Sequence, residues 1–443
     1  MFWIFAIMSL FIMLLILILP SPIPLISPHS LVTIDLSKDY TRQEIILLRK
    51  KIDTYEGINI NSGGKVVTRG RGDTALRMRS LVDCLAESHT CREYQKKVVI
   101  LASKQFRDRI MGKVSGEAIW AGSILQSLDL LGFTALMANN LAEATEIFSI
   151  FKNLTTAIIS DRGTMDLAKC WKNRRDQNCF ATENKPDLLP IWKILTMEFW
   201  ASCEHPLGTD WCLVPENYGA WLPNFKATYI GYSMENECTK IEFVPWDKRP
   251  NRTYILAKKS AYLKPERINL GFINSLATDY DIKFVMGTIE KLSIPNISNL
   301  GFLSEQGFQQ ELANSKVLLG VGDPAISPSP YNALCSGVPF INPIKTWNEN
   351  KKWDRSAWST QHDGLKYLDP PYVYNVNIHD ADAIKDAIMN AMITPISGRY
   401  ISDHMTVKSM LKRAESLILT DWCMKAKNLH AMRLEFGGEN FYL

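Results

Sequence analysis

The sequence lacks several features that would assign it to a protein class at once. Its 443 residues carry a formal net charge of only +4, with acidic and basic residues scattered along the chain, and this excess is too small to indicate nucleic-acid binding. None of its nine cysteines forms a pair separated by two residues, so the spacing of a zinc site is missing. No basic cluster precedes the apolar N-terminal stretch and no small-residue cleavage site follows it, which argues against a cleaved signal peptide.

Residues 2–19 form an uncharged apolar run, about the ~18 residues that a transmembrane helix requires. We therefore predict an uncleaved signal anchor over residues 1–20, with a cleaved signal peptide as the alternative. Prolines at positions 20, 22, 24 and 28 favour an extended spacer, and residues 21–95 are predicted to form a stem. Lys38 and Arg42 follow the apolar run, and by themselves they favour a cytoplasmic location for the residues after this run.

Residues 40–55 predict a helix with a rough apolar stripe of Ile45, Ile46, Leu48 and Ile52. A short coiled coil is one use of such a stripe, and it would give a homodimer through the stem.

The cysteine spacing and three short motifs indicate the secretory route. Close pairs predict the disulfides Cys84–Cys91, Cys170–Cys179 and Cys203–Cys212. Pairing of Cys238 with Cys423 would leave Cys335 as the free thiol, although the sequence does not fix that connectivity. The motif Asn-x-Ser/Thr makes three residues candidate sites of N-glycosylation, namely Asn153, Asn251 and Asn296.

Apolar runs alternate with helical patterns in both halves of the chain. Expected strands lie at residues 97–102, 134–139, 156–160 and 211–215, and then at 251–258, 281–286, 317–319 and 338–341. Two successive βα arrays predict an α/β protein with two facing Rossmann-like domains, the arrangement called GT-B. We place the first domain at residues 96–226, the second at 227–425 and a tail at 426–443.

The most informative stretch spans residues 315–343. An apolar run ends in Gly320 and Gly322, prolines exclude a helix through residues 324–330, and a short helix over 331–336 precedes the next apolar run. Such a crossover places a loop and a helix N-terminus at the carboxyl edge of a parallel sheet, where a phosphate binds well. By itself the pattern also fits an ordinary crossover without a ligand.

This stretch resembles the donor-domain signature of the α-1,6-mannosylglycoprotein 6-β-N-acetylglucosaminyltransferases, which form glycosyltransferase family 18. The positions that match in register are Gly320, Gly322, Pro324, Pro328, Pro330, Ala333, Gly337, Phe340, Asn342 and Pro343. Residues 228–235 resemble the family's first donor-domain strand, and residues 359–362 resemble its Thr-Ser-Gln-His motif. Gly116 and Glu117 open a predicted amphipathic helix that runs through Leu131 and stops at Gly132. They match a family Gly-Glu before a helix that ends in Leu-Leu-Gly. The resemblance covers about residues 97–425.

The resemblance implies an inverting transfer of N-acetylglucosamine from UDP-GlcNAc to the 6-hydroxyl of an α-mannose of N-glycans. It further implies a metal-independent enzyme without a cofactor, held in the Golgi membrane as a single-pass type II protein with its catalytic part in the lumen. Glu117 would be the catalytic base. Residues implied or expected to bind the donor are Lys258, Gly320, Gly322, Asn332, Lys352 and Gln361. Trp221 lies nearest the family's acceptor-stacking tryptophan, and Trp200 and Trp211 are further candidates for core or stacking roles.

Other interpretations stay open at this point. An acidic residue in the first turn of a helix, such as Glu117, also serves simply as a partner of the helix dipole. The Asp-x-Asp patterns at 279–281 and 380–382 mimic a metal site, but such short patterns recur by chance, so we expect no metal. Because Ile326 and Asn332 replace two family glutamates, the rival functions are a same-fold transferase with another donor or acceptor and a non-catalytic luminal relative.

Overall fold

The computed structural model describes residues 40–57, 59–60, 66–67, 72–113, 115–163, 167–172, 179–290 and 293–437. The signal anchor predicted over residues 1–20 lies outside these residues and stays a prediction. Within the described ranges, no helix combines the length and the apolar character needed to cross a membrane.

The first sheet has the strand order β4-β3-β5-β6-β7-β8, and all neighbouring strands are parallel. Its strands are β3 (Val98–Ala102), β4 (Thr134–Met137), β5 (Thr155–Ser160), β6 (Ile194–Met197), β7 (Cys212–Val214) and β8 (Thr228–Tyr229). The central strands β3 and β5 are buried along their whole length, as expected when helices cover both faces of a parallel sheet. We call this sheet and the helices packed on it the first lobe.

Strand β8 corrects one prediction from the sequence. Residues 228–235 were expected to open the second domain, but β8 pairs with β7, where Leu213 lies opposite Thr228. The strand is therefore the edge of the first sheet. A local pattern locates a strand, whereas the sheet that it joins depends on contacts with distant residues.

Helices α4 (Lys104–Ile110), α5 (Gly116–Leu131), α6 (Leu141–Ile150) and α7 (Leu167–Lys172) belong to the first lobe. Helix α5 has the limits that the sequence predicts. The Ser115 hydroxyl caps its first turn, Gly132 ends it, and Trp120, Ile124 and Leu128 are buried in the core.

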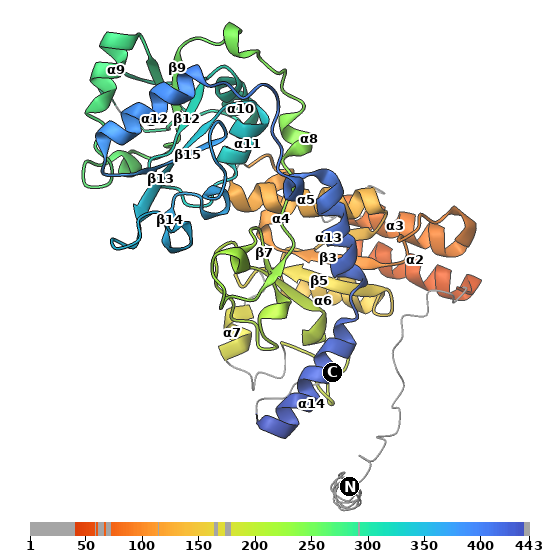
Figure 1. Cartoon of the computed structure of the whole chain (residues 1–443). Helices are drawn as coiled ribbons and strands as arrows, with labels where there is room; N and C mark the ends of the chain where they lie inside the picture. Colours follow the sequence, from red (N-terminus) through yellow and green to blue (C-terminus); the bar gives the residue numbers. More distant parts are fainter. Residues whose placement is uncertain are drawn as a thin grey trace, which may run out of the picture. The chain divides into compact units, whose positions relative to one another are not determined.

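Helices α2 (Arg42–Glu56) and α3 (Gly72–Ala86) also pack on the first lobe, next to each other (Figure 1). The Tyr55 hydroxyl donates a hydrogen bond to Glu143 of α6 at 2.8 Å, and Arg77 forms an ion pair with Asp129 of α5 at 2.6 Å. The prediction that these residues form a separate stem is therefore wrong.

The predicted coiled coil of α2 is wrong for the same reason. Most of its apolar stripe is buried against this chain, through Ile45, Leu48 and Ile52, and the remaining predicted member, Ile46, is exposed. Intramolecular burial of the stripe removes the basis for a stem-mediated homodimer. Strands β1 (Asn59–Ile60) and β2 (Val66–Val67) form an antiparallel pair between the two helices in sequence.

The second sheet has the order β11-β10-β9-β12-β13-β14, with β15 also paired to β13. Its strands are β9 (Arg252–Ile255), β10 (Lys283–Met286), β11 (Ile297–Asn299), β12 (Val317–Leu319), β13 (Phe340–Thr346), β14 (Ser359–Thr360) and β15 (Val373–Asn377). All pairs are parallel except β13 with β14. The carboxyl ends of β9, β10, β12 and β13 therefore lie at one edge.

The helices of this second lobe are α8 (Glu235–Cys238), α9 (Phe272–Tyr280), α10 (Glu305–Ala313), α11 (Ser329–Cys335) and α12 (Ala381–Ile393). Helices α9 and α12 share one buried cluster with one face of the sheet, whereas α10 and α11 contribute to the other. That second cluster continues through α5 into the first sheet, so apolar packing joins the lobes.

The last two helices, α13 (Val407–Leu419) and α14 (Trp422–Phe436), return to the first lobe (Figure 1). Arg413 of α13 donates a hydrogen bond to the carbonyl of Ile230 at 2.6 Å, and Lys425 of α14 forms an ion pair with Asp210 at 3.0 Å. Helix α14 runs through the boundary predicted at residue 425, so the predicted tail is helical as far as Phe436.

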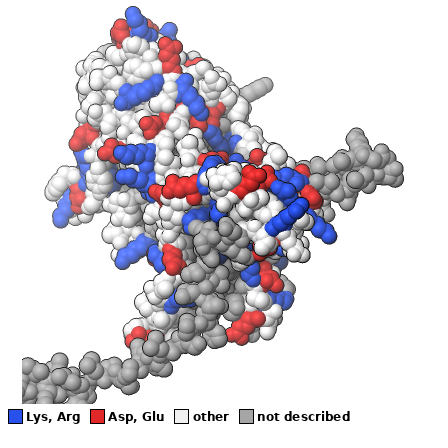
Figure 2. Space-filling model, turned by 90° about the vertical axis from the view of Figure 1, so that its right-hand side faces the viewer, with Lys and Arg blue, Asp and Glu red and all other residues white. Residues whose placement is uncertain are grey.

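Charged residues of both signs lie side by side on the face shown in Figure 2. Separately, a group of ion pairs joins the lobes. Arg109 of α4 forms ion pairs with Glu237 of α8 at 3.2 Å and with Glu305 of α10 at 2.5 Å.

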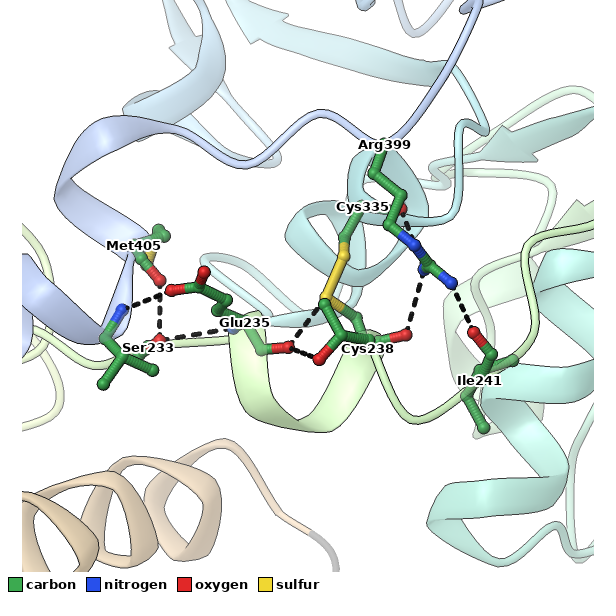
Figure 3. The surroundings of a disulfide bond; sticks show 9 residues. Ser233, Glu235, Cys238, Ile241, Cys335, Arg399 and Met405 are labelled. Atoms are coloured by element: carbon green, nitrogen blue, oxygen red, sulfur yellow. Dashed lines mark hydrogen bonds between the residues drawn. A yellow bond between two sulfur atoms is a disulfide. The ribbon is translucent and has the colours of Figure 1, made fainter. Parts of the chain in front are cut away.

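The three disulfides between neighbouring cysteines form as predicted. The fourth joins Cys238 of α8 to Cys335 of α11, and Arg399 donates hydrogen bonds to the carbonyls of both cysteines (Figure 3). The predicted pairing of Cys238 with Cys423, with Cys335 free, is therefore wrong, and Cys423 is the cysteine without a disulfide. Spacing predicts only near neighbours, whereas this bridge joins residues that are 97 positions apart.

The three candidate glycosylation residues, Asn153, Asn251 and Asn296, are exposed. Their modification stays a prediction.

Candidate active site

A cavity of about 290 Å³, which we call the interlobe cavity, is lined by residues of both lobes. The first lobe contributes Ser115 and Gly116 at the start of α5. The second lobe contributes segments that follow β9 and β10, and the loop that leads into α11. Ligands of α/β proteins bind in crevices at the carboxyl ends of the strands, so this position suits a binding site.

Gly116 leaves room for the ring of Phe199 within the first lobe. A Cβ atom at this position would lie 2.8 Å from the ring of Phe199 and 3.4 Å from Pro328 in the loop of the second lobe. Glu117, the next residue, is half-buried. The hydroxyl of Ser115 already caps α5, so the Glu117 carboxylate is not needed for that purpose.

In the loop that contains Gly320 and Gly322, the backbone amides of these glycines do not point to a ligand, contrary to the prediction. The amide of Gly320 donates to the carbonyl of Ile341 at 3.0 Å, and the amide of Gly322, where φ is 90°, donates to the side chain of Gln361 at 2.9 Å. Both amides are engaged within the protein, so neither is available to a phosphate. These two amides are therefore not expected to bind the donor phosphate, and any other contact of the two glycines with the donor stays a prediction.

Gln361 organises this loop from a buried position. Its Oε1 accepts the hydrogen bond from Gly322, its Nε2 donates to the carbonyl of Pro324 at 3.3 Å, and its own carbonyl accepts from the amide of Ile326 at 2.9 Å. Ile326 is held at φ 53°, a conformation that strains a β-branched residue. Gln361 is therefore a positioning residue for this loop, and its predicted direct contact with the donor stays a prediction.

Asn332 of α11 is a candidate ligand-binding residue. It is only 4% exposed, it lines the interlobe cavity, and its Oδ1 has no hydrogen-bond partner. An unpaired buried carbonyl costs about 1–3 kcal/mol, so a ligand hydroxyl or amide would fit here. Helix α11 has only seven residues, and we assign no anion site to its N-terminus.

Two lysines supply positive charge at this edge. Lys258 and Lys259 follow β9, are exposed and line the cavity. Lys352, the other predicted donor lysine, does not line it. Its ammonium pairs with Glu349 at 3.3 Å and lies over the ring of Trp347. Lys259 is not among the residues predicted from the sequence, although its place just after a buried strand was an available signal.

The tryptophans differ in accessibility. Trp211 is buried in the core, and Trp221 does not line the cavity. Trp200 is 51% exposed and contacts Phe199, whose ring lies against Gly116. The structure therefore favours Trp200 over Trp221 as an aromatic face near the start of α5.

Glu216 joins the lobes through hydrogen bonds with two tyrosines. It follows β7 and is fully buried, and its carboxylate accepts hydrogen bonds from the hydroxyls of Tyr232 at 2.9 Å and Tyr331 at 3.1 Å. Burial raises the pKa of the Glu216 carboxyl to about 7. Tyr331 precedes Asn332 in α11, so this contact helps to hold the candidate ligand residue. A single glutamate after a strand gave no signal for this role in the sequence.

Replacing Glu216 by glutamine is expected to flatten the pH dependence of stability. Because the folded-state pKa is raised, the wild-type free energy of unfolding falls as the pH rises from the unfolded-state pKa toward 7. Between pH 4 and pH 8, the fall in the free energy of unfolding should be smaller in the glutamine variant than in wild type by roughly 3 kcal/mol. Urea unfolding at both pH values measures this difference, with the exposed Glu87→Gln as control. Equal losses in wild type and Glu216→Gln would contradict the assignment.

The described residues contain no group of three or more His, Cys, Asp or Glu side chains that could hold a metal ion. In the two Asp-x-Asp patterns, Asp281 ends α9 and Asp380 caps α12. Both aspartates have local structural roles.

Comparisons with known proteins extend these observations. The model of glycosyltransferase family 18 matches residues 200–434. The α-1,6-mannosylglycoprotein 6-β-N-acetylglucosaminyltransferase A of Homo sapiens is 25% identical over 230 residues, which cover 48% of this chain and 30% of that protein. The B enzyme of Mus musculus is 26% identical over 237 residues, which cover 48% of this chain and 29% of that enzyme. The matched region thus spans about 30% of the length of these relatives.

Among solved structures, the UDP-N-acetylglucosamine 2-epimerase from Rickettsia bellii has a TM-score of 0.43 at 12% identity, covering 74% of this chain and 97% of that chain. This likeness is too weak to support an argument about function.

Proposed function

Because this chain belongs to glycosyltransferase family 18, we propose that it transfers N-acetylglucosamine from UDP-GlcNAc to the 6-hydroxyl of an α-mannose of N-glycans. The names of its relatives supply the transferred group and the acceptor class. The observation that carries the proposal is the unpaired Oδ1 of Asn332 in the interlobe cavity, because a hydroxyl of the donor would satisfy it. Two α/β lobes around one cavity are consistent with the GT-B arrangement.

The proposed reaction is a single displacement. The mannose 6-hydroxyl attacks C1 of N-acetylglucosamine, the bond from C1 to the diphosphate oxygen breaks, and UDP leaves with the electron pair. The configuration at C1 inverts. Glu117 takes the proton of the attacking hydroxyl, because its carboxylate lies in the first turn of α5, directly after cavity-lining Gly116.

The leaving diphosphate needs positive charge nearby. Lys258 and Lys259 at the cavity wall would stabilise the negative charge that develops on UDP as the bond to C1 breaks. Two ammonium groups can do this without a divalent ion, so we propose a metal-independent transfer that requires no cofactor.

Removal of divalent metal is therefore expected to leave the activity within about twofold, because lysine charge supplies the electrostatic stabilisation. Transfer by the purified full chain is measured with and without EDTA, with a manganese-dependent glycosyltransferase in a parallel control reaction. Full inhibition of this chain by EDTA, reversed by manganese, would contradict the proposal and make the Asp-x-Asp segments at 279–281 and 380–382 candidates again.

One observation favours a second candidate, a transferase that uses another nucleotide sugar. Ile326 and Asn332 stand where the resembling family has glutamates, and an isoleucine side chain cannot accept a hydrogen bond from a sugar hydroxyl. Incubating the full chain with a panel of UDP-sugars, with and without biantennary N-glycan, separates the two functions. Transfer from UDP-GlcNAc to the glycan supports the first. Binding of UDP without any transfer would indicate a non-catalytic relative.

We also propose a luminal position in the Golgi with a single type II anchor. Four disulfides are typical of proteins that fold in an oxidising compartment, and the exposed candidate glycosylation residues suit the same route. Trypsin digestion of sealed vesicles tests the orientation, since a luminal chain is protected until detergent is added.

A further inference from the structure

A second hollow of about 880 Å³ adjoins the interlobe cavity, and we call it the outer groove. The two share Phe302, Ser304 and Glu305 in their linings, so the groove continues the cavity toward the surface. On the side of the first lobe the groove reaches Gly112 and Lys113, in the segment that leads to α5 and Glu117. An extended molecule with one end at Glu117 could therefore lie along the outer groove.

Two polar atoms in the wall of the groove have no partner. Gln309 of α10 is only 4% exposed, and its Nε2 donates no hydrogen bond. Oε1 of Glu305 accepts none, although Oε2 of the same carboxylate is fixed by Arg109 at 2.5 Å. Buried polar groups in native proteins nearly always find a partner, so this donor and this acceptor together indicate a polar ligand. A ligand hydroxyl can both donate and accept, and it fits both atoms.

The charge of the lining excludes several ligand classes. Lys113 and Lys240 are balanced by Glu237 and Glu305, and the other polar side chains of the groove are uncharged. A phosphate or a nucleic acid strand would require an excess of positive charge, which this wall does not offer. The balance favours a neutral ligand.

Phe302 adds an apolar surface to the same groove. Its side chain is 75% exposed and lies between the groove and the cavity, in the linings of both. A ring in this position offers a flat apolar face beside polar groups, and a pyranose has a C–H face and hydroxyl edges that match this combination.

We propose that the outer groove binds a neutral oligosaccharide, namely the arm of the acceptor glycan that extends away from the reacting mannose. Gln309 and Glu305 contact its hydroxyls, and Phe302 contacts the C–H face of one sugar ring. This inference rests on the proposed function, since it names the part of the acceptor that lies outside the interlobe cavity.

The test compares Gln309→Leu with a matched control, Gln310→Leu, in the purified full chain. Gln310 lies on the same helix but is exposed and outside the groove. Leucine at 309 removes an unpaired buried donor, so folding is expected to be retained. Affinity for an agalacto biantennary N-glycan, measured by isothermal titration calorimetry, should fall about tenfold in Gln309→Leu, as expected for the loss of one hydrogen bond. Gln310→Leu should bind like wild type.

Titration of UDP into the same samples tests whether the nucleotide, and not the glycan, occupies the outer groove. Because Gln309 lies outside the interlobe cavity, its replacement should change the affinity for UDP by less than about twofold. A loss of UDP affinity with unchanged glycan affinity would overturn the proposal and assign the groove to the nucleotide. Unchanged affinity for both ligands would overturn it as well.

A second variant, Phe302→Ala, removes only an exposed side chain, and it should also weaken glycan binding about tenfold. Unchanged glycan binding in this variant would contradict the role of the ring.

Failure of the proposed function gives a different result from failure of the groove proposal. Wild type would then transfer nothing from UDP-GlcNAc, although the groove variants would still lose affinity for the glycan. A wild-type chain that transfers to methyl α-mannoside but does not bind the glycan would overturn the groove alone.

Discussion

Replacing Glu117 by glutamine is expected to lower turnover by about 100- to 10,000-fold, the effect of losing a general base. Glutamine has nearly the same shape but cannot take the proton of the attacking hydroxyl. The hydroxyl of Ser115 caps α5, so the helix should keep its stability in the variant. The proposed donor residues belong to the second lobe, so affinity for UDP should also be unchanged.

Initial rates with UDP-GlcNAc and biantennary N-glycan, together with UDP titration and thermal unfolding, measure the three quantities. Glu44→Gln is the matched control, because Glu44 is another acidic residue in the first turn of a helix and its role there is to cap α2. Near-wild-type turnover in Glu117→Gln would remove the proposed mechanism. Loss of UDP binding together with activity would indicate damage to the fold.

Removing the disulfide between Cys238 and Cys335 is expected to lower the free energy of unfolding by about 4 kcal/mol. The bridge joins positions that are 97 residues apart, and closing a long loop constrains the unfolded chain strongly. It also ties α11, which contains Asn332, to α8 (Figure 3). Affinity for UDP should therefore fall in the double variant Cys238→Ser/Cys335→Ser.

Urea unfolding without reductant measures the loss of stability. The control is Cys84→Ser/Cys91→Ser, which opens a bridge across only seven positions and should cost about 2 kcal/mol less. A larger loss in the control than in the Cys238/Cys335 variant would contradict the argument from loop length. Reduced wild type should likewise lose activity slowly, as the same constraints are released.

At the interlobe cavity, the sequence motif identified the region but not all the residues that line it. The resemblance of residues 315–343 pointed to a loop and a helix that line the cavity, and to Asn332 among them. It did not distinguish lining from supporting residues, because a match in register does not show which way a group points. Gln361 and Gly322 are used in holding the loop, and the lysines beside the cavity are Lys258 and Lys259.

The sequence by itself determined the local structure of this protein. The alternation of strands and helices, the limits of α5 and the three short-range disulfides follow from burial patterns, capping residues and spacing, all of which involve residues near one another in the chain. Tertiary structure alone decided which distant segments meet. It placed β8 in the first sheet, packed α2 on that lobe, joined Cys238 to Cys335 and buried Glu216 against Tyr331. These contacts depend on the packing of whole elements across long loops, and no periodicity within a short window records that packing.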